Sequence, residues 1–380
     1  MKTYDVIVAG LGVHGSAAAD SLAQRGLRVL GLDRYSPPHT TGSSHGGSRI
    51  IREAYFEDGA YVPLVRRAYE LWHDLEQRSG ETLLIPTGGM TIGPPHGALV
   101  RGARQSAVAH GVPYEELSSH EAAARFPDFR LNDDMVGIFE RRAGVLLPEM
   151  CVSALLSQAR TRGATIQLGE ALLAWEATPG GVEVRTTQGR YAAQTLVLAA
   201  GAWLPDLLGG LQLGLWVERQ VMHWFDSVRP AAAGQGAPMH NPVTIWEYEP
   251  ERMFYTLPDM GQGTKAAFHH DGERGAADAI RREVSDEEIH AVEAIVARHV
   301  PGLQPHSIRS ATCLYTNTPD QHFLIDAHPD HPNVVIASAC SGHGFKFAPA
   351  VGEIVGNLVT GVPDAAPDLF SAKRLARSSS

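Results

Sequence analysis

Apolar and polar positions at the start of the chain alternate as they do in a nucleotide-binding fold. Residues 4–9 form a short apolar run rich in β-branched side chains, which predicts a buried strand. The chain then turns through GLGVHG and continues into SAAADSLAQRG, where small residues predict a helix that ends at Gly26. A second apolar run at residues 28–32 predicts another strand, which ends at Asp33. The order strand, glycine turn, helix, strand is typical of dinucleotide-binding domains.

Two later regions continue this pattern of strands and helices. Residues 163–203 predict a meander with turns at 179–181 and 188–189, which closes on an apolar strand at 195–200 before Gly201. Residues 323–326 and 333–339 predict two more strands, and a glycine loop at 341–344 precedes a helix from residue 349 onward. The Ala-, Gly- and Pro-rich residues 229–239 predict a surface loop, and the last residues, 376–380, predict a frayed end.

The glycines of the first turn have the spacing that a pyrophosphate needs. Gly10 permits the tight turn, Gly12 lets the backbone approach the phosphates, and Gly15 lets the helix pack close to the strand. Asp33 lies 18 residues beyond Gly15, where an acid binds the ribose hydroxyls. The motif predicts a dinucleotide but does not separate FAD from NAD.

Composition limits the classes of function. The chain has 380 residues, enough for two domains, and a net charge of −10, which argues against a nucleic-acid or anionic-membrane surface. Three cysteines are too few and too scattered for a disulfide framework or a zinc site. No stretch of about 18 uncharged apolar residues is present, so a soluble cytoplasmic protein is predicted.

Two groups of side chains have simple structural interpretations. A Pro-rich surface turn, HPDHPN at 328–333, explains a group of acids and histidines, so no metal is predicted there; they are Asp320, Asp326, His328, Asp330 and His331. Cys151 and Cys340 are predicted to be small buried hydrophobic residues, and spacing alone gives Cys313 the same interpretation.

The stretch TTGSSHGGSRIIREAY predicts an anion site. Arg49 and Arg52 flank two isoleucines that favour burial, and a buried guanidinium is costly unless an anion meets it. Lys346 lies between two phenylalanines after the second glycine loop, which is unusual for a solvated lysine.

Five separated motifs resemble one family. The motifs GLGVHGSAAA, SSHGGSRIIREAY, LAAGAW, CLYTNTPDQHFLID and SGHGFKF resemble the monomeric sarcosine oxidase and N-methyltryptophan oxidase group of flavoenzymes, from the first strand to about residue 360. The resemblance implies an α/β fold with a Rossmann-like FAD-binding domain at 1–84, 145–217 and 308–375. It also implies a substrate domain built on a mixed sheet, at 85–144 and 218–307.

The resemblance also implies roles for individual residues. FAD would be joined covalently through Cys313 as an 8α-S-cysteinyl thioether, with Cys340 the weaker candidate. Arg52 and Lys346 match the pair that grips the substrate carboxylate, and Lys265 matches the lysine proposed to activate oxygen.

Arg49 matches a position beside the isoalloxazine ring, where a positive charge would stabilise reduced flavin. Tyr255 matches a pocket wall, with Phe254 as the other choice. Large side chains at 222–224 and 245–247 are assigned either to the core or to the pocket. The predicted catalytic residues are Lys265, Arg49 and His45; the substrate-binding residues are Arg52, Lys346, His269, Tyr255 and Tyr315; the cofactor-binding residues are Gly10, Gly12, Val13, His14, Gly15, Asp33, Arg34, Ser43, Ser44, Ser48, Gly201, Cys313, Gly342, Gly344, Phe345 and Lys346.

The implied reaction is the oxidation of a secondary, N-methyl amino acid. The substrate would enter as a neutral amine and leave as an imine that water hydrolyses, while O2 becomes hydrogen peroxide; no protein base is assigned. The alternative is a flavin dehydrogenase of a pipecolate- or proline-like amino acid that uses an acceptor other than O2. An RNA-modifying flavoprotein would need a basic surface, which this chain lacks. The predicted partners are therefore a small amino acid and O2, with no nucleic acid and no membrane, and the protein is predicted to be a monomer.

Overall fold

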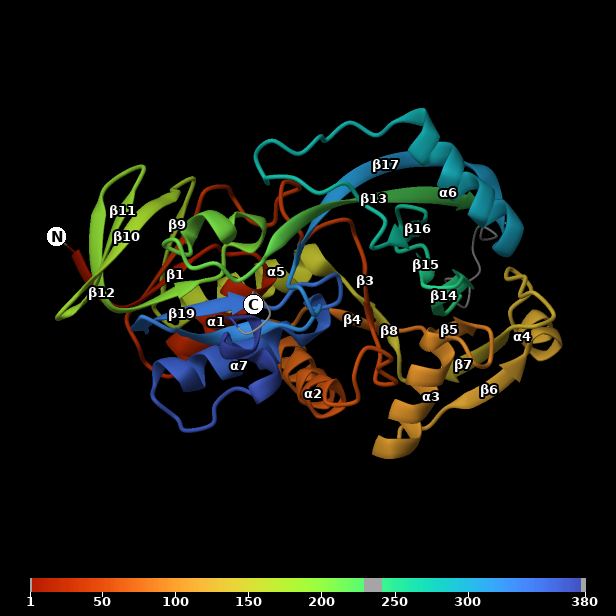
Figure 1. The fold of residues 1–380 in the computed structure, drawn as a ribbon, viewed down its shortest axis with the longest axis horizontal. Helices are drawn as coiled ribbons and strands as arrows, with labels where there is room; N and C mark the ends of the chain where they lie inside the picture. Colours follow the sequence, from red (N-terminus) through yellow and green to blue (C-terminus); the bar gives the residue numbers. More distant parts are fainter. Residues whose placement is uncertain (1, 229–240, 377–380) are drawn as a thin grey trace.

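The computed structural model describes residues 2–228 and 241–376. The surface loop predicted at 229–239 lies outside this part, and so does the frayed end predicted at 376–380 except for its first residue, which ends a helix. Two eight-stranded sheets lie side by side, and a three-stranded sheet lies between them (Figure 1). The predicted α/β class is confirmed.

The first sheet is the one predicted for a dinucleotide. Its parallel strands are β9, β2, β1, β12 and β19, and the antiparallel strands β10, β11 and β18 complete it. The carboxyl half of β1 is apolar, as expected for a strand whose side chains are buried on both faces of the sheet. The bounds of its strands are β1 (Lys2–Ala9), β2 (Val29–Asp33), β9 (Thr165–Leu168), β10 (Leu172–Thr178), β11 (Gly181–Thr186), β12 (Arg190–Leu198), β18 (Leu324–His328) and β19 (His331–Ser338).

Helices cover one face of this sheet, and α7 is seen below it in Figure 1. Helix α1 packs against α5 and α7, and α2 packs against the same two helices. The other face is covered by residues 204–215, which include η2, and by the C-terminal helix α8. The bounds are α1 (Val13–Gln24), α2 (Tyr61–Ser79), α5 (Pro148–Thr161), α7 (Ala348–Val359), α8 (Lys373–Ala376), η1 (Gly201–Trp203), η2 (Pro205–Leu207), η3 (Phe345–Phe347) and η4 (Asp368–Phe370).

The second sheet is mixed, because β14 pairs in parallel with β5 whereas its other neighbours pair antiparallel. Its strand order is β17-β13-β16-β15-β14-β5-β7-β6. The bounds are β5 (Gly89–Gly93), β6 (Glu115–Ser118), β7 (Val136–Glu140), β13 (Trp216–Ser227), β14 (Val243–Glu249), β15 (Arg252–Leu257), β16 (Thr264–His269), β17 (Leu303–Asn317), α3 (Ala98–His110), α4 (Ser119–Arg125) and α6 (Asp286–His299).

The small third sheet, of β3 (Arg49–Ile51), β4 (Leu84–Pro86) and β8 (Gly144–Leu146), links the two halves. The division into domains stays a prediction. β17 pairs with the second sheet along its whole length, although the predicted limit falls at residue 308 within it.

The predicted Pro-rich turn is present at residues 329–330, which are exposed between β18 and β19. His328 is nevertheless not a surface residue, because it ends β18 and is buried beside Trp175, with the two ring centres 5.7 Å apart. Within the described residues, no cluster of three or more His, Cys, Asp or Glu side chains could hold a metal ion. Over the same part of the chain, no helix is long and apolar enough to cross a membrane.

Candidate functional site

A cavity of about 410 Å³ lies between the two large sheets. It begins at the carboxyl ends of β1, β2 and β12, where parallel α/β sheets bind their ligands. It continues under β13, β15, β16 and β17 of the second sheet. The predicted cofactor end and the predicted substrate end are therefore parts of one cavity.

The first glycine turn forms a cradle that no larger residue could form. Gly10 has φ +91°, and an added Cβ would lie 2.5 Å from the Ala199 carbonyl oxygen. A Cβ on Gly15 would lie 1.8 Å from the Gly10 carbonyl oxygen, so Gly15 serves close packing, as predicted. Gly12 lines the cavity at the start of α1, where backbone N–H groups attract phosphate.

Asp33 lies at the nucleotide end of the cavity. Its carboxylate accepts hydrogen bonds from the Leu11 N–H at 2.7 Å and the Tyr35 N–H at 2.8 Å. Burial raises the pKa of Asp33, although these two donors oppose the rise. The acid is fixed beside the glycine turn, where a ribose would lie.

Arg49 lies beside Cys313 in the wall of the cavity. Its guanidinium donates to the Ser48 carbonyl at 2.8 Å and the Ser43 carbonyl at 2.7 Å, and Nη2 lies 3.7 Å from Cys313 Sγ. Cys340 also lines the cavity and is only half-buried, so its prediction as a simple core residue is wrong, whereas Cys151 is buried. Two thiols therefore lie along this wall.

Lys265 is fully buried, with 1% of its surface exposed. Its ammonium donates to the Gly46 carbonyl at 3.1 Å and to the Ser48 carbonyl. Burial, and secondarily the Arg49 charge, lower the pKa of Lys265 well below its ordinary value. Glu149 holds the same loop, since it accepts from the Gly46 N–H at 2.7 Å.

Arg52 and Lys346 line the wall at the substrate end. The Arg52 guanidinium donates to both Glu57 oxygens, at 2.9 and 2.8 Å, and to the Ala54 carbonyl at 2.7 Å. It lies 4.5 Å from the centre of the Tyr55 ring, and Lys346 Nζ donates to the same tyrosine's hydroxyl at 3.3 Å. Burial, followed by the Arg52 charge, lowers the pKa of Lys346 to about 7.

Aromatic side chains form another part of the wall. His269 lies 3.3 Å from the Tyr315 hydroxyl, and the Tyr255 ring centre is 6.4 Å from that of His269. Burial and the neighbouring His270 lower the pKa of His269, and burial raises the pKa of Tyr255 to about 12, so both are neutral near pH 7.

The two alternatives left open by the sequence are decided by the structure. Tyr255 lines the cavity, whereas Phe254 lies in the core and stacks on Trp246 at 5.2 Å. Of the large side chains at 222–224 and 245–247, Met222 and Ile245 line the cavity. The others belong to the second sheet's packing.

The structure brings nearly all the predicted residues to this cavity. The exceptions are Gly15 and His45, which do not line it. His45 is buried, its Nε2 has no hydrogen-bond partner among the described residues, and burial lowers its pKa to about 3. The roles of all these residues stay predictions.

Several cavity residues had not been predicted from the sequence. They include Phe56, Glu57, Trp203 and Asp278. One feature of the sequence could have indicated Glu57, since it is an acid five residues after an arginine that is predicted to be buried. No feature of the sequence indicates Asp278, because it lies in a polar segment far along the chain from the other cavity residues.

These residues fit FAD. The glycine cradle would hold a pyrophosphate, the buried Asp33 a ribose, and the Arg49 charge lies beside the Cys313 sulfur in the same cavity. The unpartnered Nε of Arg52, among the described residues, leaves one buried donor free for a ligand.

Comparisons with known proteins agree with this geometry. The model of the family "FAD dependent oxidoreductase" matches residues 5–358. A monomeric sarcosine oxidase of Streptomyces avermitilis is 43% identical over 98% of both chains, and an N-methyl-L-tryptophan oxidase of Yersinia pestis is 34% identical over 98% of this chain and 99% of its own. The structure of NikD, an unusual amino acid oxidase essential for nikkomycin biosynthesis, is 25% identical with a TM-score of 0.85 over 98% of both chains. The L-proline dehydrogenase of P. horikoshii, 20% identical with a TM-score of 0.85 over 99% of both chains, shares the fold.

Proposed function

This chain belongs to the FAD dependent oxidoreductase family, and on that premise we propose that it is an oxidase of secondary, N-methyl amino acids that reduces O2 to hydrogen peroxide. The observation that carries the proposal is the pair Arg52 and Lys346, two buried cations on one wall of the cavity that also contains the glycine cradle. A small anion bound between them would lie inside the cavity and away from water.

FAD would be held by the glycine turn and Asp33 at one end and by a thioether from Cys313 at the other. Bound FAD supplies the two-electron acceptor for oxidation of the C–N bond and passes those electrons to O2. The position of Cys313 supports the attachment, because its sulfur lines the same cavity as the glycine turn and lies 3.7 Å from Arg49 Nη2.

Arg52 and Lys346 would bind the carboxylate of the substrate. A guanidinium can bind both carboxylate oxygens at once, and an ammonium adds a second charge-assisted contact. Since Glu57 already occupies two donors of Arg52, the substrate would have to replace Glu57 or bind the remaining donors. Binding would also raise the charge on Lys346, whose pKa of about 7 leaves it partly neutral beforehand.

The rest of the pocket would accept the amine in its neutral form. His269 and Tyr255 are uncharged near neutral pH, and Met222 and Ile245 are apolar. These side chains exclude water and leave the carboxylate as the substrate's only charged anchor. Pocket width at Met222 and Ile245 would then set the size of the side chain that is accepted.

Lys265 supports an oxidase over a dehydrogenase. It is a buried lysine that donates to the same loop as Arg49, and an ammonium in a dry site would stabilise the negative charge that develops on O2. We further propose that the protein acts as a monomer, in line with the names of its relatives, which gel filtration tests.

The test is a peroxide-release panel across N-methyl amino acids of increasing side-chain size, beginning with sarcosine. Arg52→Ala is the matched variant, and its kcat/KM should fall by about 10- to 100-fold, because a hydrogen bond to a charged group contributes about 1.5–3 kcal/mol. Equal turnover by this variant would refute the carboxylate grip. A rate seen only with an added dye, and none with O2, would show a dehydrogenase. A yellow pellet after acid denaturation, lost in Cys313→Ser, is expected for the thioether.

A further inference from the structure

Residues 270–285, which we call the strap, connect β16 to α6. In Figure 1 the strap is the teal segment that leaves the second sheet and reaches over β13 and β17 toward the first sheet. Its first part runs along β13, because the Arg219 N–H donates to the Glu273 carbonyl at 2.8 Å and the Gly275 N–H donates to the Val217 carbonyl at 3.1 Å. Gly272 permits this approach, since an added Cβ would lie 1.7 Å from the Arg219 carbonyl oxygen.

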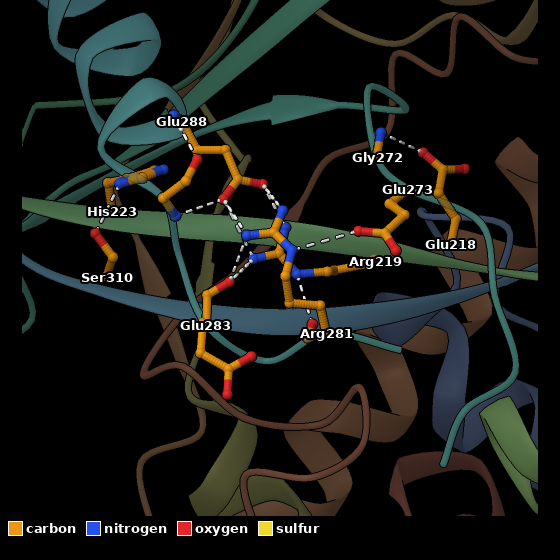
Figure 2. Close-up of polar contacts among 10 residues, drawn as sticks. Glu218, Arg219, His223, Gly272, Glu273, Arg281, Glu283, Glu288 and Ser310 are labelled. Atoms are coloured by element: carbon orange, nitrogen blue, oxygen red, sulfur yellow. Dashed lines mark hydrogen bonds and ion pairs between the residues drawn. The ribbon is translucent and has the colours of Figure 1, made fainter. Parts of the chain in front are cut away.

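Buried polar contacts hold the two ends of the strap to the second sheet (Figure 2). At the first end, Glu218 accepts from the Gly272 N–H at 3.1 Å. At the second end, the guanidinium of Arg219, only 1% exposed, donates to the Arg281 carbonyl at 2.7 Å and to the Glu288 carboxylate. Breaking a buried, fully bonded arginine pair is costly, so both ends are fixed.

The middle of the strap lies against the nucleotide end of the cavity. Asp278 accepts from the Trp203 indole N–H at 2.7 Å and pairs with Arg34 at 3.1 Å. All three side chains line the cavity together with Tyr35, and the Arg34 guanidinium lies 5.4 Å from the centre of that ring.

This middle contact is weaker than the contacts at the ends. The Arg34 and Asp278 side chains are 37% and 61% exposed, and an exposed ion pair contributes about 0–1 kcal/mol. Ala277 and Ile280 add a small apolar contact with Ala202 and Leu314. The strap is therefore held by strong buried contacts to the second sheet at its two ends and by a weak exposed contact at the nucleotide end of the cavity.

We propose that the strap is part of the binding site for the adenosine diphosphate half of the dinucleotide, and that Asp278 closes that end of the site. The inference rests on the proposed FAD site and adds a binding residue from the segment assigned to the substrate domain. Asp278 orders Trp203 and Arg34, whose flat groups form the wall against which an adenosine would lie. Loss of this contact should speed release of ligands that carry the adenosine and leave other flavins unaffected.

The test uses flavin held without a covalent bond, in the Cys313→Ser protein. In this background Asp278→Asn removes the charge and keeps the size of the side chain. Asp271→Asn is the matched control, because Asp271 lies on the same strap, is 53% exposed, pairs with Arg252 at 3.3 Å and does not line the cavity. Release rates of FAD and of FMN, which lacks the adenosine, are followed by flavin fluorescence after dilution.

Asp278→Asn should speed FAD release by about three- to fivefold, the effect of losing about 1 kcal/mol, and should leave FMN release unchanged. Asp271→Asn should change neither rate. Equal FAD release from the two variants would overturn the inference, and so would an equal acceleration of FMN release, which would indicate only a loosened fold. Failure of the Cys313→Ser parent itself to hold FAD would instead count against the proposed function.

Discussion

Replacing Lys346 by methionine should make the substrate-free protein more stable at neutral pH. Burial lowers the pKa of this lysine from 10.5 to about 7, which corresponds to about 5 kcal/mol at 1.36 kcal/mol for each pH unit. Methionine removes that cost but also loses the hydrogen bonds to the His343 carbonyl and the Tyr55 hydroxyl, each about 1 kcal/mol. The net expectation is a gain of about 3 kcal/mol in the free energy of unfolding at pH 7.

The pH dependence gives this prediction its sign. The unfolded chain keeps the lysine proton up to pH 10.5, whereas the folded protein gives it up near pH 7, so wild-type stability rises with pH between these values. The gain in the free energy of unfolding of Lys346→Met over wild type is therefore largest below pH 7 and becomes smaller as the pH rises. Near pH 10.5 the variant should be less stable than wild type by about 2 kcal/mol, because only the lost hydrogen bonds remain.

Urea unfolding of the flavin-bound protein between pH 6.5 and 10 measures the difference. Lys373→Met on α8, where the side chain is exposed, is the control and should differ little from wild type at every pH. A difference between Lys346→Met and wild type that does not change with pH would refute the reasoning, as would a loss of stability in the variant at pH 7.

Three further changes have defined outcomes. Lys265→Met should leave anaerobic flavin reduction by substrate intact and slow the reaction with O2 by about 10²–10³-fold, measured by stopped flow; an unchanged oxygen rate would contradict its role. Glu57→Gln should lower stability by about 3 kcal/mol, because Arg52 loses its buried partner, and should lower KM for carboxylate substrates; a raised KM would show that Glu57 supports binding. Gly10→Ala should lower the free energy of unfolding by about 1–3 kcal/mol and reduce flavin binding, because the backbone at this position needs φ +91°. A variant with a normal melting temperature and full flavin content would contradict this.

Local patterns explain what the sequence could predict. The glycine turn, the strand before Asp33 and the loop from Ser43 to Arg52 are each short segments whose residue types and order have a physical reason. The α/β class followed from them, because strand, turn and helix are decided by neighbours along the chain.

Contacts between distant segments could not be predicted in this way. Asp278 meets Arg34 across 244 residues, and nothing in the sequence around either residue indicates the other. The strands that carry Met222 and Ile245 alternate side chains between two faces, and only the pairing of β13 and β14 in the sheet decides which face meets the cavity. Lys265 shows the same limit, since residue pattern alone suggests a surface lysine and the fold buries it.

The central claim is that Arg52 and Lys346 hold the carboxylate of the substrate. It is tested most directly by mixing the protein without oxygen with sarcosine or with sarcosinamide, in which a neutral amide replaces the carboxylate, and following the loss of flavin absorbance. Two charge-assisted contacts predict that sarcosine reduces the flavin with a kcat/KM about 10³ times higher, and that Arg52→Ala removes most of this preference. Equal bleaching by the amide and the acid in the wild-type protein would contradict the account.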